Sequence, residues 1–338
     1  MLARLSLLLV AMMLAGLAGL RGAKPAPLAG GRLVVANQRE HTVLVIDPNN
    51  RRELAKISVG VNGHEVIVSK DGRFAYVPIY GNSGVGRPGT DGSTIDVIDL
   101  RECKLAATID LGKPLRPHRA EFGPDGLLYV TAELGNAVDV INPSKRKVIA
   151  EIPTGEPQSH MLVLSSDGRR GYTANVGAGS VSVLDLANRK LIATIPVAKS
   201  VQRISISPDG HRIFTHDQDE PRIAVIDTAT NKISSWITLP DVAYASAPTP
   251  DGRWLLAVSR VANRLFVVNL QTLKVAQSLD VPGGSSEVLV RPGGEIAYVS
   301  GTGAGKIAVL DLGSWKMQPP IDLTPGVDGL AWAPAMPQ

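Results

Sequence analysis

Three histidines at related positions are the residues of this sequence best suited to chemistry. His64, His118 and His160 are separated by 54 and then 42 residues. Neutral imidazole is the commonest metal ligand in proteins, and three such ligands leave one coordination position open in zinc or copper sites. If the histidines converge, they could hold one divalent metal ion. They could also bind a ligand without a metal, or form hydrogen bonds between neighbouring structural units.

Charged and aromatic residues share the spacing of the histidines and extend this candidate site. Glu65 and Arg119 directly follow two of the histidines, Arg203 and Glu287 stand at the corresponding places farther along the chain, and Tyr244 corresponds to the histidines themselves. The two arginines could bind an anionic ligand. We favour the interpretation that they form ion pairs with the two glutamates.

The elements that must position these residues form a repeat. A turn of the type Pro-Asp-Gly recurs between apolar runs, where proline sets one dihedral angle and glycine supplies a positive φ. Its aspartate or the equivalent residue stands at Asp71, Asp125, Asp167, Asp209, Asp251, Gly293 and Ala335. The first interval is 54 residues and each later interval is 42. A second signature, seen for example at Val181-Ser-Val-Leu-Asp185, occurs seven times with the same period.

This period predicts an all-β, seven-bladed β-propeller with four antiparallel strands in each blade. The first copy starts directly at Arg32 and lacks an opening strand, whereas Val327–Pro334 reads as an opening strand with nothing after it. We therefore expect the C-terminal strand to complete the N-terminal blade and close the ring, which removes exposed sheet edges. Residues 32–338 would then be a single propeller domain.

Several segments resemble the YVTN-family β-propeller repeat. They are Lys113–His118, Tyr129–Ala132, Tyr172–Asn175, Val181–Asp185 and Tyr298–Ser300. The resemblance covers about residues 32–334. The resemblance implies a propeller exported by a bacterium or archaeon, and it identifies no catalytic residue.

The propeller model places the candidate residues at one end of the ring, which we call the top face. Counting back seven positions from each turn gives the residues at the top of the inner strands, namely Asp328, His64, His118, His160, Gln202, Tyr244 and Ser286. The next positions are Gly329, Glu65, Arg119, Met161, Arg203, Ala245 and Glu287. The extra residues of the long interval, in segment 80–94, could fold over this end and bring Arg87 and Asp91, or form a flexible surface loop. Glu65, Glu133 or Asp91 could then complete a metal site or accept a ring N–H.

The N-terminus reads as a targeting segment. Arg4 precedes the apolar run Leu5–Leu20, which has the length of a signal-peptide core rather than of a membrane span. We assign residues 1–23 to a signal peptide, with a retained N-terminal anchor as the alternative, and 24–31 to a linker. The propeller is therefore expected in the periplasm or outside the cell. The mature chain would have no membrane span if the signal peptide is removed.

Composition excludes some functions and leaves three. With 35 basic and 31 acidic residues and 4% aromatics, the sequence gives no indication of a nucleic-acid partner. The single cysteine, Cys103, excludes an internal disulfide and the Cys-x-x-Cys-His attachment of haem. The favoured function is an exported binding module, expected to be monomeric, with a small molecule or protein at the top face. The alternatives are a metal-assisted hydrolase or lyase for a small lactone or ester, using the three histidines, and a structural protein of the cell envelope.

Overall fold

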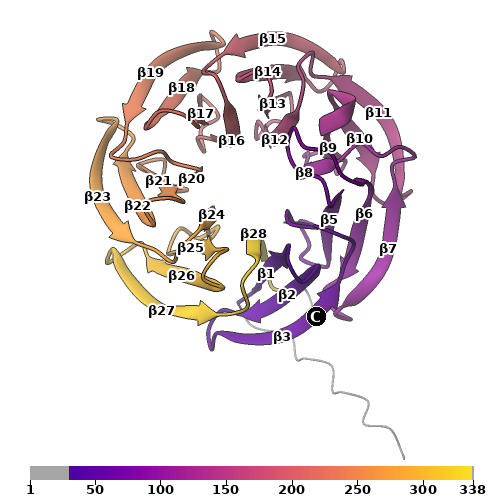
Figure 1. The fold of residues 1–338 in the computed structure, drawn as a ribbon, viewed down its shortest axis with the longest axis horizontal. Coiled ribbons are helices and arrows are strands. Elements are labelled where there is room, and N and C mark those ends of the chain that lie inside the picture. The colour runs from indigo at the N-terminus through magenta and orange to yellow at the C-terminus, as the bar shows by residue number, and fades with distance from the viewer. Residues whose placement is uncertain (1–29, 337–338) are drawn as a thin grey trace, which may run out of the picture.

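The protein is a closed ring of seven β-sheets. The structure, a computed structural model, describes residues 30–336, and their strands form seven four-stranded sheets arranged as blades around a central axis (Figure 1). Every pair of neighbouring strands is antiparallel, as in the pairing of β1 with β2. The prediction of an all-β, seven-bladed propeller with four strands per blade is confirmed.

The first four blades are described from the axis outward. Blade 1 contains β28 (Val327–Ala333), β1 (Arg32–Asn37), β2 (Thr42–Asp47) and β3 (Arg52–Ser58). Blade 2 contains β4 (Ile67–Val68), β5 (Phe74–Gly81), β6 (Asp91–Asp99) and β7 (Lys104–Asp110). Blade 3 contains β8 (Pro117–Phe122), β9 (Leu128–Ala132), β10 (Ala137–Asn142) and β11 (Lys147–Pro153). Blade 4 contains β12 (Ser159–Leu164), β13 (Arg170–Asn175), β14 (Ser180–Asp185) and β15 (Lys190–Pro196).

The remaining three blades follow the same order. Blade 5 contains β16 (Val201–Ile206), β17 (Arg212–Asp217), β18 (Arg222–Asp227) and β19 (Lys232–Thr238). Blade 6 contains β20 (Ala245–Pro248), β21 (Trp254–Ser259), β22 (Arg264–Asn269) and β23 (Lys274–Asp280). Blade 7 contains β24 (Ser285–Val290), β25 (Ile296–Gly301), β26 (Lys306–Asp311) and β27 (Lys316–Asp322). A 3₁₀ helix, η1 (Glu133–Gly135), follows β9.

The C-terminal strand closes the ring as predicted. β28 pairs antiparallel with β1, with Leu33 opposite Trp332. At the seam between blades 1 and 2, the backbone N–H of Gly329 donates a hydrogen bond of 2.9 Å to the carbonyl oxygen of His64. A Cβ atom on Gly329 would lie 2.5 Å from that oxygen. The close approach of the two inner strands therefore requires glycine at this position.

The hydrophobic core is divided among the interfaces between blades. Seven clusters of buried apolar side chains each span two neighbouring blades. Val34 of β1 packs towards Val77 of blade 2, whereas Leu33 packs towards Tyr298 of blade 7. Successive side chains of a strand point to opposite faces, and both faces of a blade are covered. This explains why middle strands such as β1 and β2 are buried over their whole length.

The loop in the blade 2 insertion is shorter than the sequence predicts. Segment 80–94 was expected to be a loop, but β5 continues to Gly81 and β6 begins at Asp91, with these two residues paired. The irregular part is therefore only 82–90, because the added residues extend the ladder between the two strands.

Part of the predicted N-terminal organisation lies outside the described residues. This applies to the predicted signal peptide, 1–23, and to residues 24–29 of the predicted linker. In the part of the chain that the structure describes, no helix is long and apolar enough to cross a membrane.

Candidate functional site

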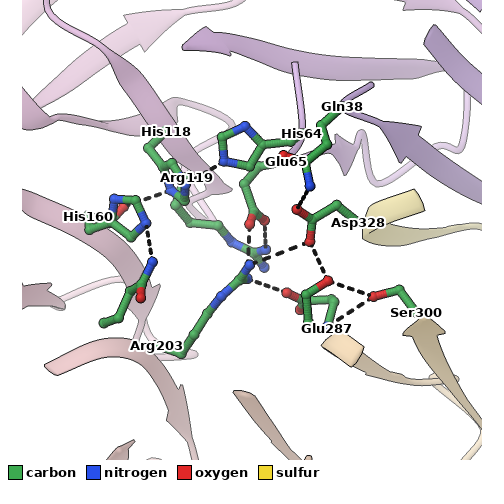
Figure 2. A network of polar contacts seen from close by, with 12 residues as sticks. Gln38, His64, Glu65, His118, Arg119, His160, Arg203, Glu287, Ser300 and Asp328 are labelled. Atoms are coloured by element: carbon green, nitrogen blue, oxygen red, sulfur yellow. Dashed lines mark hydrogen bonds and ion pairs between the residues drawn. The ribbon is translucent and has the colours of Figure 1, made fainter. Parts of the chain in front are cut away.

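The starts of the inner strands bring the predicted polar residues together at the top of the ring (Figure 2). His118 and Arg119 lie on β8, His160 lies on β12, and His64 and Glu65 stand shortly before β4. Inner strands of neighbouring blades pack against each other around the axis. Residues that are 42 or 54 positions apart in the chain therefore become neighbours in space.

His118 contacts both of the other predicted histidines. The Nε2 atoms of His64 and His118 lie 2.9 Å apart, and the rings of His118 and His160 stack with their centroids 3.5 Å apart. His118 and His160 are buried, whereas His64 is partly exposed. His64 thus forms the side of the cluster that is open to solvent.

Backbone carbonyls decide which nitrogen of His64 and His118 carries the proton. The Nδ1 atom of His64 is 3.0 Å from the carbonyl oxygen of Asn62, and the Nδ1 atom of His118 is 3.1 Å from the carbonyl oxygen of His160. A carbonyl oxygen only accepts hydrogen bonds, so both Nδ1 atoms must donate. In the neutral rings the two Nε2 atoms then carry lone pairs, and these lone pairs face each other.

His160 is held by a buried carboxylate. Oε2 of Glu133, in η1, accepts hydrogen bonds from Nδ1 of His160 at 3.1 Å and from the hydroxyl of Tyr80 at 2.7 Å. Nη1 of Arg116 lies 3.6 Å from the other carboxylate oxygen. Nε2 of His160 accepts from the side-chain amide of Gln202 at 3.1 Å. Glu133 thus accepts a ring N–H, one of the two roles considered from the sequence.

Arg116 and Tyr80 were not among the candidate residues, and Arg116 has a clear structural role. Its Nε donates to Asp91 at 2.6 Å, while Nη1 and Nη2 donate to the carbonyl oxygens of Gly84 and Arg87 at 2.9 and 2.8 Å. It thereby ties the loop 82–90 to the top face. In sequence, the one signal was the place of Arg116 directly before Pro117-His118.

The two charged residues predicted on the insertion do not join the histidines. Asp91 pairs with Arg116, and the side chain of Arg87 is exposed. Among residues 30–336, neither side chain forms a hydrogen bond or ion pair with a histidine. The reason is that the buried Arg116 guanidinium binds Asp91 and holds the loop through its backbone.

An ionic layer crosses the axis next to the histidines (Figure 2). Glu65 of blade 2 lies 2.9 Å from Nη1 of Arg119 through Oε2, and 2.9 Å from Nη1 of Arg203 through Oε1. Arg203 of blade 5 also pairs with Glu287 of blade 7. Oδ1 of Asp328 lies 3.9 Å from Nη2 of Arg203. The arginines are therefore engaged in the ion pairs favoured from the sequence, and some of these pairs bridge blades that are not adjacent.

Burial and the neighbouring charges shift the pKa values of these groups in opposite directions. Burial raises the pKa of Glu287 to about 7, since Arg203 only partly offsets it and Glu65 adds a like charge. For Glu65, burial is outweighed by Arg203 and Arg119, so its pKa lies below the usual range. Burial and the adjacent rings hold the pKa of His118 well below that of a free histidine. Glu65 is therefore ionised and His118 is neutral at pH 7.

Tyr244 and the axial cavity complete the site. The ring of Tyr244 lies 5.3 Å from the guanidinium of Arg203 and 4.3 Å from that of the exposed Arg260. A cavity of about 260 Å³ runs along the axis. It is lined by Arg119, Arg203 and Glu287, by Ser205 and Ser246, and by apolar side chains of the inner strands. The ionic layer thus borders an internal space as well as the histidine cluster.

One group of side chains in this site has the donor atoms and spacing of a metal site. One ligand atom from each of His64, Glu65 and His118 lies within 4.8 Å of the other two. His160, the third histidine predicted as a ligand, uses both ring nitrogens in hydrogen bonds with Glu133 and Gln202. The structure therefore groups a carboxylate with two of the three histidines.

Comparison with solved structures defines the class of protein as a seven-bladed β-propeller. The chain is similar to Kuenenia stuttgartiensis hydrazine synthase, with a TM-score of 0.72 and 20% identity over 83% of this chain and 92% of that one. It is similar to a functionally unknown protein from Desulfotomaculum acetoxidans DSM 771, with a TM-score of 0.75 and 15% identity over 90% and 99% of the two chains. A third similar structure is dihydro-heme d1 dehydrogenase NirN in complex with DHE, with a TM-score of 0.64 and 16% identity over 91% and 79%.

At these identities the likeness concerns the fold alone. No protein-family model and no curated protein matches the sequence. The function must therefore be argued from the site.

Proposed function

We propose that this protein is an exported propeller of the YVTN type that binds a cationic ligand at the top of its central channel. The observation that carries the proposal is the charge of the buried network. Three arginines and six carboxyl groups belong to it, which gives a formal charge of −3 when every carboxyl group is ionised and the histidines are neutral. They are Arg116, Arg119, Arg203, Glu65, Asp91, Glu121, Glu133, Glu287 and Asp328. Since the pKa of Glu287 is raised to about 7, the network keeps a charge between −2 and −3 at neutral pH.

An excess of negative charge in this position favours a cation. The side chains of the network are at most 24% exposed, so water screens them poorly. Burying carboxylates without matching positive charge is costly unless they take up protons or bind a cation. Rim arginines such as Arg87 and Arg260 are exposed and offset the excess only weakly. An anionic ligand would add to the repulsion, since Arg119 and Arg203 are already paired.

The sequence supports both the proposed family and the proposed location outside the cytoplasm. The repeats resemble those of the YVTN family, and the apolar run Leu5–Leu20 behind Arg4 is typical of export. The closed ring completes every blade with four strands and leaves only short outer strands as sheet edges. We therefore propose a monomer that meets its ligand in the periplasm or outside the cell.

The proposal is tested by measuring which ions stabilise the purified protein. Thermal unfolding is followed with the chlorides of Zn²⁺, Mg²⁺, ethylammonium and guanidinium, and with sodium acetate and phosphate. A ligand at 100 times its Kd should add about 2.7 kcal/mol to the free energy of unfolding, which raises the Tm by a few degrees. Acetate or phosphate raising the Tm more than every cation would refute the proposal.

A matched pair of variants locates the effect. Glu65→Gln removes one buried charge of the network, whereas Asp251→Asn removes a carboxylate at a turn remote from it, where Asp251 is bound by its own turn. The stabilisation by cations should fall in the first variant and persist in the second. An unchanged response of Glu65→Gln would place the binding elsewhere.

A second candidate function is a metal-assisted hydrolase or lyase for a small lactone or ester. The observation that favours it is the pair formed by Glu133 and His160, because a histidine oriented by a buried carboxylate can act as a general base. A screen of lactones and esters in the presence of Zn²⁺ tests this function. If His160→Ala keeps the turnover, His160 is not the general base and this second candidate function loses its support.

A further inference from the structure

The hydrogen bonds of His64 and His118 leave a conflict that a bound proton or metal ion resolves. Each Nδ1 donates to a backbone carbonyl, at 3.0 and 3.1 Å, so both Nε2 atoms are acceptors 2.9 Å apart in the neutral protein. Two acceptors at hydrogen-bond distance repel each other unless a cation lies between or beside them. From this geometry, and resting on the proposed binding of a cation at the channel mouth, we infer that the ligand is a divalent transition-metal ion of the zinc type, bound by His64, His118 and Glu65.

The positions of the two imidazole nitrogens suit such an ion. Zinc binds nitrogen at about 2.0–2.1 Å, so two nitrogens at tetrahedral angles around it lie about 3.4 Å apart. The rings would have to separate by about 0.5 Å to reach this spacing. The carbonyl of Asn62 and that of His160 already orient the two rings through Nδ1, as the outer partners of metal-bound histidines do.

Glu65 supplies the third donor. Its side chain is 1% exposed, and Oε2 accepts a hydrogen bond from Arg119. Oε1 lies 2.9 Å from Nη1 of Arg203, but the angles of this ion pair do not make a hydrogen bond, and Oε1 has no other partner. One oxygen of this carboxylate lies within 4.8 Å of a ring nitrogen of each of the two histidines. A buried carboxylate that still has an oxygen without a hydrogen bond, and that two arginines hold in place, can serve as a metal ligand.

The donor set determines the class of metal. Two imidazole nitrogens and one carboxylate oxygen suit Zn²⁺ and Co²⁺, and leave a fourth position towards the solvent side of His64. Mg²⁺ and Ca²⁺ prefer six or more oxygen ligands, which this group does not offer. His160 lies outside the set because Glu133 and Gln202 occupy its nitrogens. The inferred set therefore differs from three histidines by one ligand.

The test compares metal affinities of variants of the tag-free, full propeller. Zn²⁺ binding is measured by calorimetry and Co²⁺ binding by its visible absorption bands. We expect one ion per chain, with at least 100-fold weaker binding in His64→Ala, His118→Ala and Glu65→Gln. His160→Ala should lose less than 10-fold, and His211→Ala, at a turn of the opposite face, should bind as the unmodified protein does. An equal loss in His160→Ala, or Mg²⁺ binding as tightly as Zn²⁺, would overturn the assignment.

A measurement on the unmodified protein keeps the test independent of folding defects. Nitrogen-15 NMR of the metal-free protein should show His64 and His118 protonated on Nδ1, and Zn²⁺ should shift both Nε2 signals. A doubly protonated ring in the pair that Zn²⁺ leaves unchanged would show that a proton takes the place assigned to the metal. If Zn²⁺ fails but ethylammonium still stabilises the protein, the metal assignment fails and the proposed function stands. If no cation binds, both fail.

Discussion

Replacing Asp139 by asparagine should stabilise this protein at neutral pH. Asp139 lies on β10, is 1% exposed, and its Oδ1 atom has no hydrogen-bond partner. It stands directly opposite Glu151 of β11. Burial, reinforced by the charge of Glu151 and only partly offset by Lys113, raises the pKa of Asp139 from 3.8 to about 6.

The sign and size of the effect follow from this shift. The folded state holds the proton of Asp139 more tightly than the unfolded state, so stability is lost as the pH rises from 3.8 through 6. At pH 7.5 the ionised side chain would cost up to about 3 kcal/mol, and at pH 4 about 0.5 kcal/mol. Asparagine carries no charge at either pH. We expect Asp139→Asn to gain about 1–3 kcal/mol at pH 7.5, or roughly 2–5 °C in Tm for a domain of about 300 residues.

Blade 2 offers a matched control. Asp96 occupies the same repeat position, but it faces Thr108 rather than a glutamate. Its two carboxylate oxygens accept hydrogen bonds from the backbone N–H of Gly60 and from the hydroxyl of Thr108, both at 2.8 Å. Asp96→Asn should therefore lose about 1–2 kcal/mol. The same substitution is expected to have opposite signs at the two positions.

The assay is thermal or urea unfolding of the two variants and the unmodified protein at pH 4 and 7.5. The reasoning is refuted if Asp139→Asn is no more stable at pH 7.5, or if its advantage is the same at pH 4. Glu151→Gln should give part of the stabilisation expected for Asp139→Asn at pH 7.5, because it removes the negative charge that faces Asp139.

Three further predictions concern acid sensitivity, ring closure and the insertion. Burial lowers the pKa of His216 to about 4, so the free energy of unfolding falls as the pH drops from 6.5 towards 4 and the unfolded chain takes up the proton more readily. At pH 5 this costs about 2 kcal/mol, which the variant His216→Leu should not lose. Unfolding of both proteins at pH 7.5 and 5 measures the difference. Gly329→Ala should lower the Tm by several degrees, because its Cβ would lie 2.5 Å from a backbone oxygen. Gly313→Ala, whose Cβ has ordinary contacts, should not lower it. Equal Tm values for the two variants would contradict the close approach of the inner strands of blades 1 and 2. Arg116→Ala should leave the propeller folded but speed proteolysis and hydrogen exchange in loop 82–90, and unchanged exchange there would argue against its clamping role.

The candidate site shows which kinds of inference the sequence supported. The repeat period was enough to place His64, His118 and His160 at the same end of the ring and to favour ion pairs between Arg203 and glutamates, but it left open whether the histidines converge. It was not enough to show that Arg203 reaches Glu65 across the axis, because that depends on the width of the channel. Arg116 occupies a repeated backbone position, two residues before His118, but the equivalent residues Asn62 and Gln158 are of other types, so the repeat gives no indication of its role. The roles of Arg116 and Tyr80 come from contacts between the insertion and blade 3.

The sequence by itself determined the number of blades, their strand order and the closure by β28. The number of blades and the strand order follow from local signals, namely the Asp-Gly turns and the repeated apolar strand segments, each of which acts within a few residues. The closure follows from the incomplete repeats at the two ends, which pair across the ring. Only the tertiary structure decided how the polar residues at the top are partnered. The carbonyls that place the protons of His64 and His118 on Nδ1 belong to the backbone around the ring, and their positions are set only when all seven blades have packed. The same packing brings Glu65, rather than His160, into the group of atoms suited to a metal ion.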